Sequence, residues 1–396
     1  MKKYYLTLTG MCMLIGFFAQ AQEYTQSVTI QFDVVPASYT IVPADLKYNK
    51  NVAYSLTIDD GYVDVWNVAY PLIQGNPVVE TDMFLGNNYG SGMPFQRVGG
   101  YRFSDGCGQM LPFRLGLAIN ASQMGKNSRR LSWEQLKTLY QADWDILNHG
   151  HYHAEELPID FQDEIVQNAG QINDHIGFYP RHFAIPANQS AYVGKTQNLG
   201  MVATYGAVNG FLGVYNNGYW QVGGDISAVN NHLKLIRTSV PVDSASLNLS
   251  ALMSKFQSIA TLGQTQPIWY NEYTHAIGAG TNQYPTNSNL GFQLFRDYMG
   301  FIADNYADVV WIAGLQEVEE YLYVRDNALI TNQVLNGNQL TFDIVLSHAQ
   351  EDQRHFDLSL LVKPIGAQIT NISVANDSNA SSNKSTGLIN LSLTQN

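Results

Sequence analysis

Two adjacent carboxylates stand where an apolar run meets a glycine in Leu56-Thr57-Ile58-Asp59-Asp60-Gly61. Adjacent side chains at a strand end point in different directions, so these two acids can serve one metal ion and one proton separately. A plain strand that ends in an Asp-Gly turn explains the same residues. The pair therefore indicates a functional site only in combination with other potential metal ligands elsewhere in the chain.

A histidine cluster follows a second apolar run, in Asn148-His149-Gly150-His151-Tyr152-His153. His149 and His153 are four residues apart, which places two imidazoles on one side of a helical turn, an arrangement typical of a transition-metal site. A surface cluster of histidines is the alternative. We favour the metal site because three of the chain's 9 histidines fall within five positions there. The apolar run 268–273 precedes a further histidine, His275, which gains weight only as a partner of these two signals.

From residue 51 onward, apolar runs alternate with helical patterns, which predicts an α/β fold with a mostly parallel sheet or barrel. One helix is expected at 131–140, where Ser132 and Gln135 form a capping box. The other expected elements are strands at 52–58, 145–147, 182–185, 268–273 and 309–312, and helices at 161–176, 292–305 and 316–324.

The two ends of the chain have β patterns. Residues 28–35 alternate apolar and polar side chains, and 38–42 form a second short β-like stretch. Beyond 325, strand patterns follow one another at 340–346, 356–362, 369–374 and 388–393. We therefore expect an N-terminal β segment at 22–50, an α/β domain at 51–325 and a small antiparallel, β-sandwich-like module at 326–396.

Residues 1–21 are typical of a signal peptide: Lys2 and Lys3 precede an apolar run at 11–18 and the small-x-small site Ala19-Gln20-Ala21. The run is too short to span a bilayer, so no transmembrane segment is expected after cleavage. The mature protein is then periplasmic, at the cell surface or secreted. Cys12 leaves with this segment, and Cys107 alone makes no intramolecular disulfide.

Composition narrows the class of partner. Hydrophobic residues make up 45%, enough for a substantial core, whereas charged residues make up only 14%. The formal net charge of -12 disfavours nucleic acid and anionic membranes as partners. A neutral polar partner such as a glycan fits better.

The ordered motifs resemble those of the polysaccharide deacetylases of carbohydrate esterase family 4, also called NodB-homology domains. That family has a Thr-x-Asp-Asp-Gly strand end, a His-x-x-x-His turn, an Arg-x-Pro loop and an apolar strand that ends in His. Asp59 and Asp60 match the first motif, His149 and His153 the second, and His275 the last. The resemblance covers residues 52–324 and implies an irregular (β/α)7-type barrel with its site at the C-terminal ends of the strands.

The resemblance also implies a mechanism. Asp60, His149 and His153 would bind one divalent ion, zinc by default, with cobalt, nickel or manganese as alternatives. Asp59 would be the base that deprotonates the attacking water, and His275 the acid that protonates the leaving amine or alcohol. The nearby acids Glu155, Glu156 and Asp64 are interpreted as solvated.

One position departs from the family pattern. Aligning 180–188 on the third motif places Ala184 where the family has the arginine that holds the catalytic aspartate. Arg181 and Arg237 are the candidates to replace it. The same loop keeps Pro186, and the backbone N–H of Ala187 stands at the family's position for an oxyanion donor.

Three functions remain open on this sequence. The favoured one is an exported, metal-dependent hydrolase that removes acetyl groups, at amide or ester bonds, from an acetylated polysaccharide or oligosaccharide. The second is a catalytically impaired carbohydrate-binding protein on a deacetylase fold, which Ala184 favours. The third is a non-haem Fe(II) oxygenase, which also uses two histidines and a carboxylate but needs neither a second adjacent acid nor His275.

Overall fold

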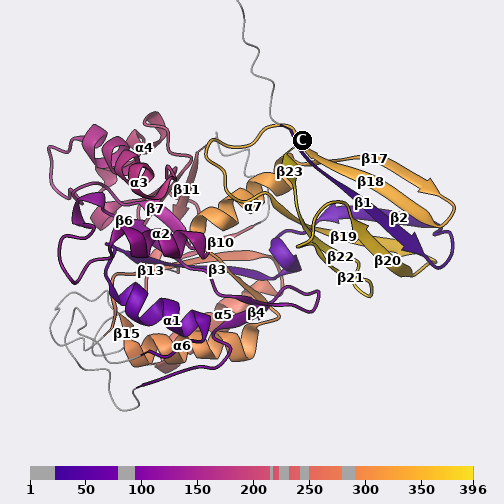
Figure 1. Ribbon diagram of the computed structural model, residues 1–396, viewed down its shortest axis with the longest axis horizontal. Helices are drawn as coiled ribbons and strands as arrows, with labels where there is room; N and C mark the ends of the chain where they lie inside the picture. Colours follow the sequence, from indigo (N-terminus) through magenta and orange to yellow (C-terminus); the bar gives the residue numbers. More distant parts are fainter. Residues whose placement is uncertain are drawn as a thin grey trace, which may run out of the picture.

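The computed structural model describes residues 23–78, 94–214, 217–222, 232–240, 249–278 and 290–395. The segment expected to be a signal peptide, with Cys12, lies outside the described residues. An α/β barrel and a β module lie side by side along the long axis of the molecule (Figure 1). Within the ranges described, no helix has the length and apolarity needed to cross a membrane.

The barrel is built from parallel strands in the order β3-β6-β7-β8-β9-β11. After β11, a single residue leads to β12, which pairs in parallel with β13, and β13 pairs in parallel with β3. The sheet thus returns to its first strand and is nearly closed, which confirms the expected α/β barrel. The strands are β3 (Val52–Asp59), β6 (Gly116–Ile119), β7 (Asp145–Asn148), β8 (His182–Ala184), β9 (Ala203–Gly206), β11 (Leu233–Ile236), β12 (Thr238–Ser239) and β13 (Ile268–Thr274).

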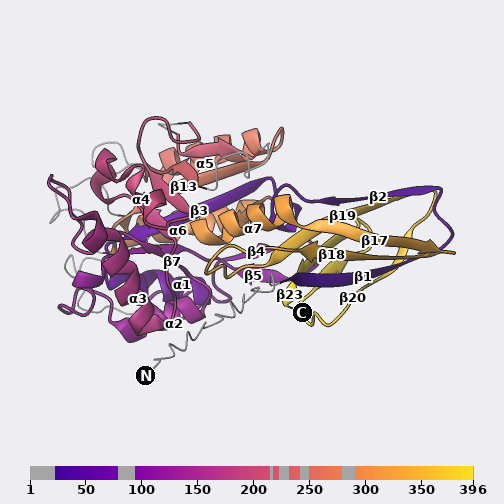
Figure 2. The ribbon, with the colours of Figure 1, turned by 90° about the horizontal axis from the view of Figure 1, so that it is seen from above.

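Helices cover the outside of this sheet (Figure 2). The first turn of α2 is capped as expected, because the Ser132 hydroxyl accepts from the Gln135 backbone N–H while the Gln135 side chain accepts from that of Ser132. Strand β3 is buried at all eight positions, as a strand covered on both faces must be. The helices are α1 (Tyr70–Gln74), α2 (Trp133–Gln141), α3 (Asn168–Ile176), α4 (Lys195–Asn198), α5 (Leu249–Gly263), α6 (Phe292–Tyr306) and α7 (Leu315–Asn327).

The β module contains two antiparallel sheets, and both ends of the chain contribute to it (Figure 1). In one sheet, β1 (Tyr24–Phe32) lies between β18 (Gln339–Leu346) and β20 (Ile369–Val374), and β17 (Leu329–Asn336) pairs with β18. In the other, β2 (Ser38–Pro43) pairs with β19 (Asp357–Ile365), which also pairs with β22 (Leu388–Ser392). The N-terminal segment, expected as a separate piece, therefore shares its sheets with the C-terminal strands.

Candidate active site

Two strand ends of the barrel bring the predicted acids and histidines together. Asp59 is the last residue of β3 and Asp60 follows it, while His149 follows β7. His149 Nε2 lies 3.7 Å from Asp59 Oδ2 and 3.6 Å from Asp60 Oδ1, and His153 Nε2 lies 3.7 Å from the same Asp60 oxygen. The carboxyl ends of parallel strands thus gather four side chains from two distant segments at one point.

Asp60, His149 and His153 fit the ligand set of a divalent ion. Two ligand atoms bound at about 2.1 Å to one tetrahedral ion lie about 3.4 Å apart, close to the separations observed here. The buried His149 Nε2 has no hydrogen-bond partner among the described residues, so it is free to act as a ligand. Asp60 and His153 have φ angles of 71° and 61°, a left-handed conformation that non-glycine residues adopt at a cost and that is concentrated at functional sites.

Each histidine is oriented through its other ring nitrogen. His149 Nδ1 lies 2.8 Å from the Ala184 carbonyl oxygen, so Nδ1 donates and Nε2 faces the acids. His153 Nδ1 lies 3.0 Å from Glu155 Oε1. Partners of this kind fix the ring orientation of metal ligands. The interpretation of Glu155 as a solvated acid therefore misses its contact with His153, although its side chain is largely exposed.

Arg237 takes the position opposite Asp59. Its Nη1 and Nη2 donate to the two Asp59 oxygens, each at 2.8 Å, and both side chains are almost fully buried. The guanidinium also lies over the Tyr273 ring, 4.4 Å from its centroid. Arg181, the other candidate, pairs instead with Glu351 and Asp352 in the β module.

These contacts determine the charge state of the site. Burial acts to raise the pKa of Asp59, but the Arg237 guanidinium and the nearby His149 outweigh it, so this pKa lies below its usual value. Burial lowers the pKa of His149 to about 4. Asp59 is therefore an anion and His149 is neutral at pH 7, as a proton acceptor and a metal ligand must be.

The remaining predicted residues lie at the C-terminal ends of two other barrel strands, β13 and β8. His275 follows β13, is partly exposed, and lies close enough to Asp59 to contribute to the lowered pKa of that acid. Pro186 and Ala187 follow β8 in a short 3-10 turn, η5 (Pro186–Asn188), in which Ala187 has φ 45°. The structure gives the positions of these residues, and their catalytic roles stay predictions.

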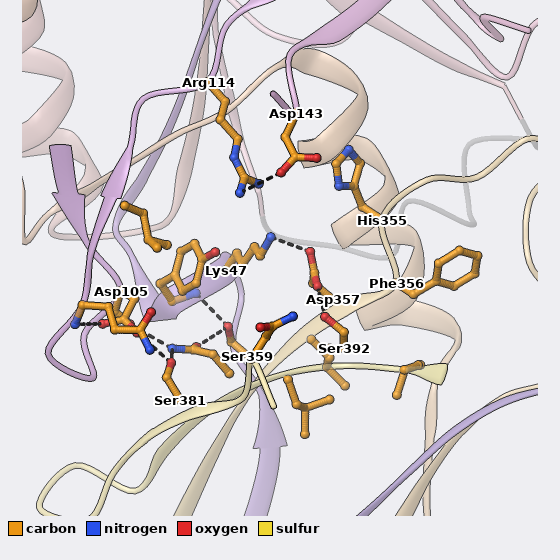
Figure 3. Close-up of a pocket in the computed structure, with 18 of the residues that line it drawn as sticks. Lys47, Asp105, Arg114, Asp143, His355, Phe356, Asp357, Ser359, Ser381 and Ser392 are labelled. Atoms are coloured by element: carbon orange, nitrogen blue, oxygen red, sulfur yellow. Dashed lines mark hydrogen bonds and ion pairs between the residues drawn. The ribbon is translucent and has the colours of Figure 1, made fainter. Parts of the chain in front are cut away.

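A second group of possible metal ligands lies at the opposite end of the barrel. Ligand atoms of Glu317, His355 and Asp357 lie within 4.8 Å of one another, beside a pocket of about 540 Å³ between barrel and module. Lys47 points toward Asp357 in this pocket (Figure 3), and its Nζ is 2.6 Å from Asp357 Oδ2 and 2.8 Å from Glu317 Oε1. Because the Lys47 ammonium already pairs with both acids and Arg114 also pairs with Glu317, we interpret this group as an ion-pair network that joins the two parts.

Several solved structures are similar to this chain at low identity. The Streptococcus pyogenes deacetylase PplD, in complex with acetate, is 13% identical with a TM-score of 0.27, over 38% of this chain and 54% of that protein. The polysaccharide deacetylase Bc1974 from Bacillus cereus is 10% identical with a TM-score of 0.36, over 68% of this chain and 94% of that one. The Bc1960 peptidoglycan N-acetylglucosamine deacetylase is 12% identical with a TM-score of 0.37, over 69% of this chain and 90% of that one. The alignment spans about half of the streptococcal protein.

A family model matches one part of the chain. No curated protein matches this chain. Residues 47–202 match the family model described as polysaccharide deacetylase, and this range contains Asp59, Asp60, His149 and His153. The match covers less than half of the chain, supports polysaccharide deacetylation in general, and shows that residues 47–202 are similar to the polysaccharide deacetylase family.

Proposed function

We propose that this chain is a metal-dependent hydrolase that removes acetyl groups from a polysaccharide or oligosaccharide. The observation that carries the proposal is the buried Asp59, which Arg237 holds as an anion beside a group of three side chains suited to one divalent ion. A site that only bound a metal ion would not need this second, separately held carboxylate.

The residues divide the chemistry among them. Asp60, His149 and His153 would hold the ion, with zinc as our first expectation, and a bound ion supplies Lewis acidity for water attack on an acetyl carbonyl. Asp59 accepts the proton from the attacking water. His275 protonates the leaving amine or alcohol as its bond to the acetyl carbon breaks, and the Ala187 N–H donates to the oxyanion. The products are acetate and the free amine or hydroxyl of the glycan.

A binding protein without turnover is the second candidate, because Ala184 stands where the family motif has arginine. Arg237 weakens this alternative, since it makes with Asp59 the contact that an arginine at 184 would make. An oxygenase site leaves Asp59 and its buried arginine without a use.

The test is acetate release from acetylated chitin oligomers, peptidoglycan and acetylxylan, with zinc or cobalt added. General acid–base groups contribute about 10² to 10⁴ in rate, so Asp59→Asn should lower acetate release by that factor while the bound metal stays the same. Absence of metal-dependent release on all three glycans, or equal release by the variant, would leave the binding protein as the better candidate.

The proposal includes export, on the pattern of residues 1–21. N-terminal sequencing of the protein expressed in a secreting host should begin at Gln22. Recovery of protein that still contains Lys2 and Lys3 would contradict the proposed export and would leave the proposed activity unaffected.

A further inference from the structure

Glu164 is a buried carboxylate that the roles above leave unused. It lies in η4 (Gln162–Gln167), with 2% of its surface exposed. Glu164 Oε1 accepts the backbone N–H of Tyr152 at 2.9 Å, and Oε2 accepts that of Ala154 at 3.1 Å. One carboxylate therefore holds the residues directly before and after His153.

The same carboxylate reaches the loop that carries Ala187. The Tyr192 hydroxyl, in η6 (Ser190–Tyr192), lies 3.1 Å from both Glu164 Oε2 and the Ala154 carbonyl oxygen. The Gln189 side chain donates to the Glu155 carbonyl oxygen at 2.7 Å. These contacts tie the histidine loop to the segment that follows η5.

Gly150 shows how closely the two loops and Glu164 approach one another. It has φ 77°, and a Cβ built there would lie 2.4 Å from Glu164 Oε2 and 3.2 Å from Pro186 Cγ. A side chain at this position would push the carboxylate from its place. Glycine thus allows the carboxylate, the histidine loop and Pro186 to meet.

We propose that Glu164 and Tyr192 form a clamp that positions the ligand His153 and sets the histidine loop against the oxyanion loop at 186–188. The inference rests on the proposed function. Both Glu164 oxygens accept hydrogen bonds, so the group acts as a positioning residue and not as a ligand or a base. Holding His153 in its left-handed conformation before an ion arrives reduces the ordering cost of metal binding.

Glu164→Gln tests the clamp, because an amide supplies only one acceptor oxygen and would turn an N–H donor toward a backbone N–H. We expect metal affinity, measured by chelator competition with zinc, to fall about 10- to 100-fold, as for other residues that support metal ligands. The cobalt absorption spectrum should change with it. Glu156→Gln, an exposed acid in the same loop, is the matched control and should leave both readouts unchanged.

Tyr192→Phe tests the second half of the clamp with little change in volume. Zinc affinity should stay within about twofold of the wild-type value. The kcat for acetate release should fall by about tenfold, which corresponds to the free energy of one net hydrogen bond, and KM should be nearly unchanged. Thermal unfolding of each variant separates lost affinity from lost folding. If Glu164→Gln does not fold, the kcat of Tyr192→Phe is the test of the clamp.

Wild-type zinc affinity in a folded Glu164→Gln variant overturns the clamp, as does an unchanged kcat in Tyr192→Phe. The proposed function fails separately, when the wild-type protein releases no acetate from any glycan. Zinc affinity is measured without substrate, so the two failures are distinguishable.

Discussion

Arg237→Met is the variant that most directly examines the site. Methionine keeps much of the apolar stem of arginine but removes the guanidinium. Both Asp59 oxygens then lose a 2.8 Å charge-assisted hydrogen bond, although Asp59 stays 1% exposed. A buried charge that loses its partner typically costs about 3–5 kcal/mol of stability. We expect this decrease in the free energy of unfolding of the metal-free protein.

Asp59→Asn and the double variant Asp59→Asn/Arg237→Met complete the comparison. The double variant removes both charges, so it should be less destabilised than Arg237→Met alone. Arg181→Met is the matched control, because Arg181 pairs with the more exposed Glu351 and Asp352. Exposed pairs contribute about 0–1 kcal/mol, and the control should lose no more than that.

Urea denaturation and acetate release measure the two consequences. Arg237→Met should lower acetate release about 10- to 100-fold, as losses of supporting residues do, and so less than loss of the base in Asp59→Asn. Equal stability of Arg237→Met and Arg181→Met would refute the reasoning. So would a double variant whose destabilisation equals the sum of the two single changes, since the charges would then be energetically independent.

Three further outcomes follow from the structure. His149→Ala should abolish tight metal binding, and one metal ion per chain retained after dialysis against a weak chelator would contradict the ligand set. Burial raises the pKa of Glu319 from 4.5 to about 8, so the folded state keeps a proton that the unfolded chain releases. The free energy of unfolding should therefore fall between about pH 5 and pH 8, and Glu319→Gln should flatten this fall in urea denaturation; an unchanged slope would contradict it. Truncation after Ala328 should leave no soluble barrel by gel filtration, because β1 loses every strand with which it pairs and Glu320 loses the backbone N–H groups of Arg354 and His355. Recovery of a folded, metal-binding core would show the barrel to be separable.

The barrel and the position of its site were predictable because local pattern and topology agree. Apolar runs that alternate with helices require parallel strands, and parallel strands place their carboxyl ends together. Asp59 ends one such run and His149 directly follows another, so the order of elements along the chain was enough to predict that the two side chains lie at the same end of the barrel. The capping box at Ser132 was equally local, since its two bonds join residues three apart.

Contacts that depend on which strands become neighbours were not predictable in this way. The alternation of Val28, Ile30 and Phe32 gives the buried face of β1, whereas Val34 lies beyond the strand and is exposed. The pattern contains no information about β18 and β20 as neighbours. Glu155 stands in a polar stretch whose sequence is typical of a solvated loop, and Glu164 stands in the first turn of the helix expected at 161–176, where its pattern does not show a contact with the histidine loop. The Glu155 contact with His153 is set by the conformation of the histidine loop itself, and the Glu164 hydrogen bonds exist only because that loop folds back over η4.

Ala184 shows why one missing motif residue does not indicate a lost site. Its backbone carbonyl orients His149, and any residue at this position supplies that oxygen. The guanidinium comes instead from Arg237, the single residue between β11 and β12, where the chain leaves β9 and begins to pair with β13. Because β13 is itself a neighbour of β3, an arginine at this junction lies beside the end of β3 and reaches Asp59. The near closure of the barrel thus brings a second strand end beside Asp59. The counter-ion that the motif places at the end of β8, at position 184, can therefore come from the junction of β11 and β12 instead.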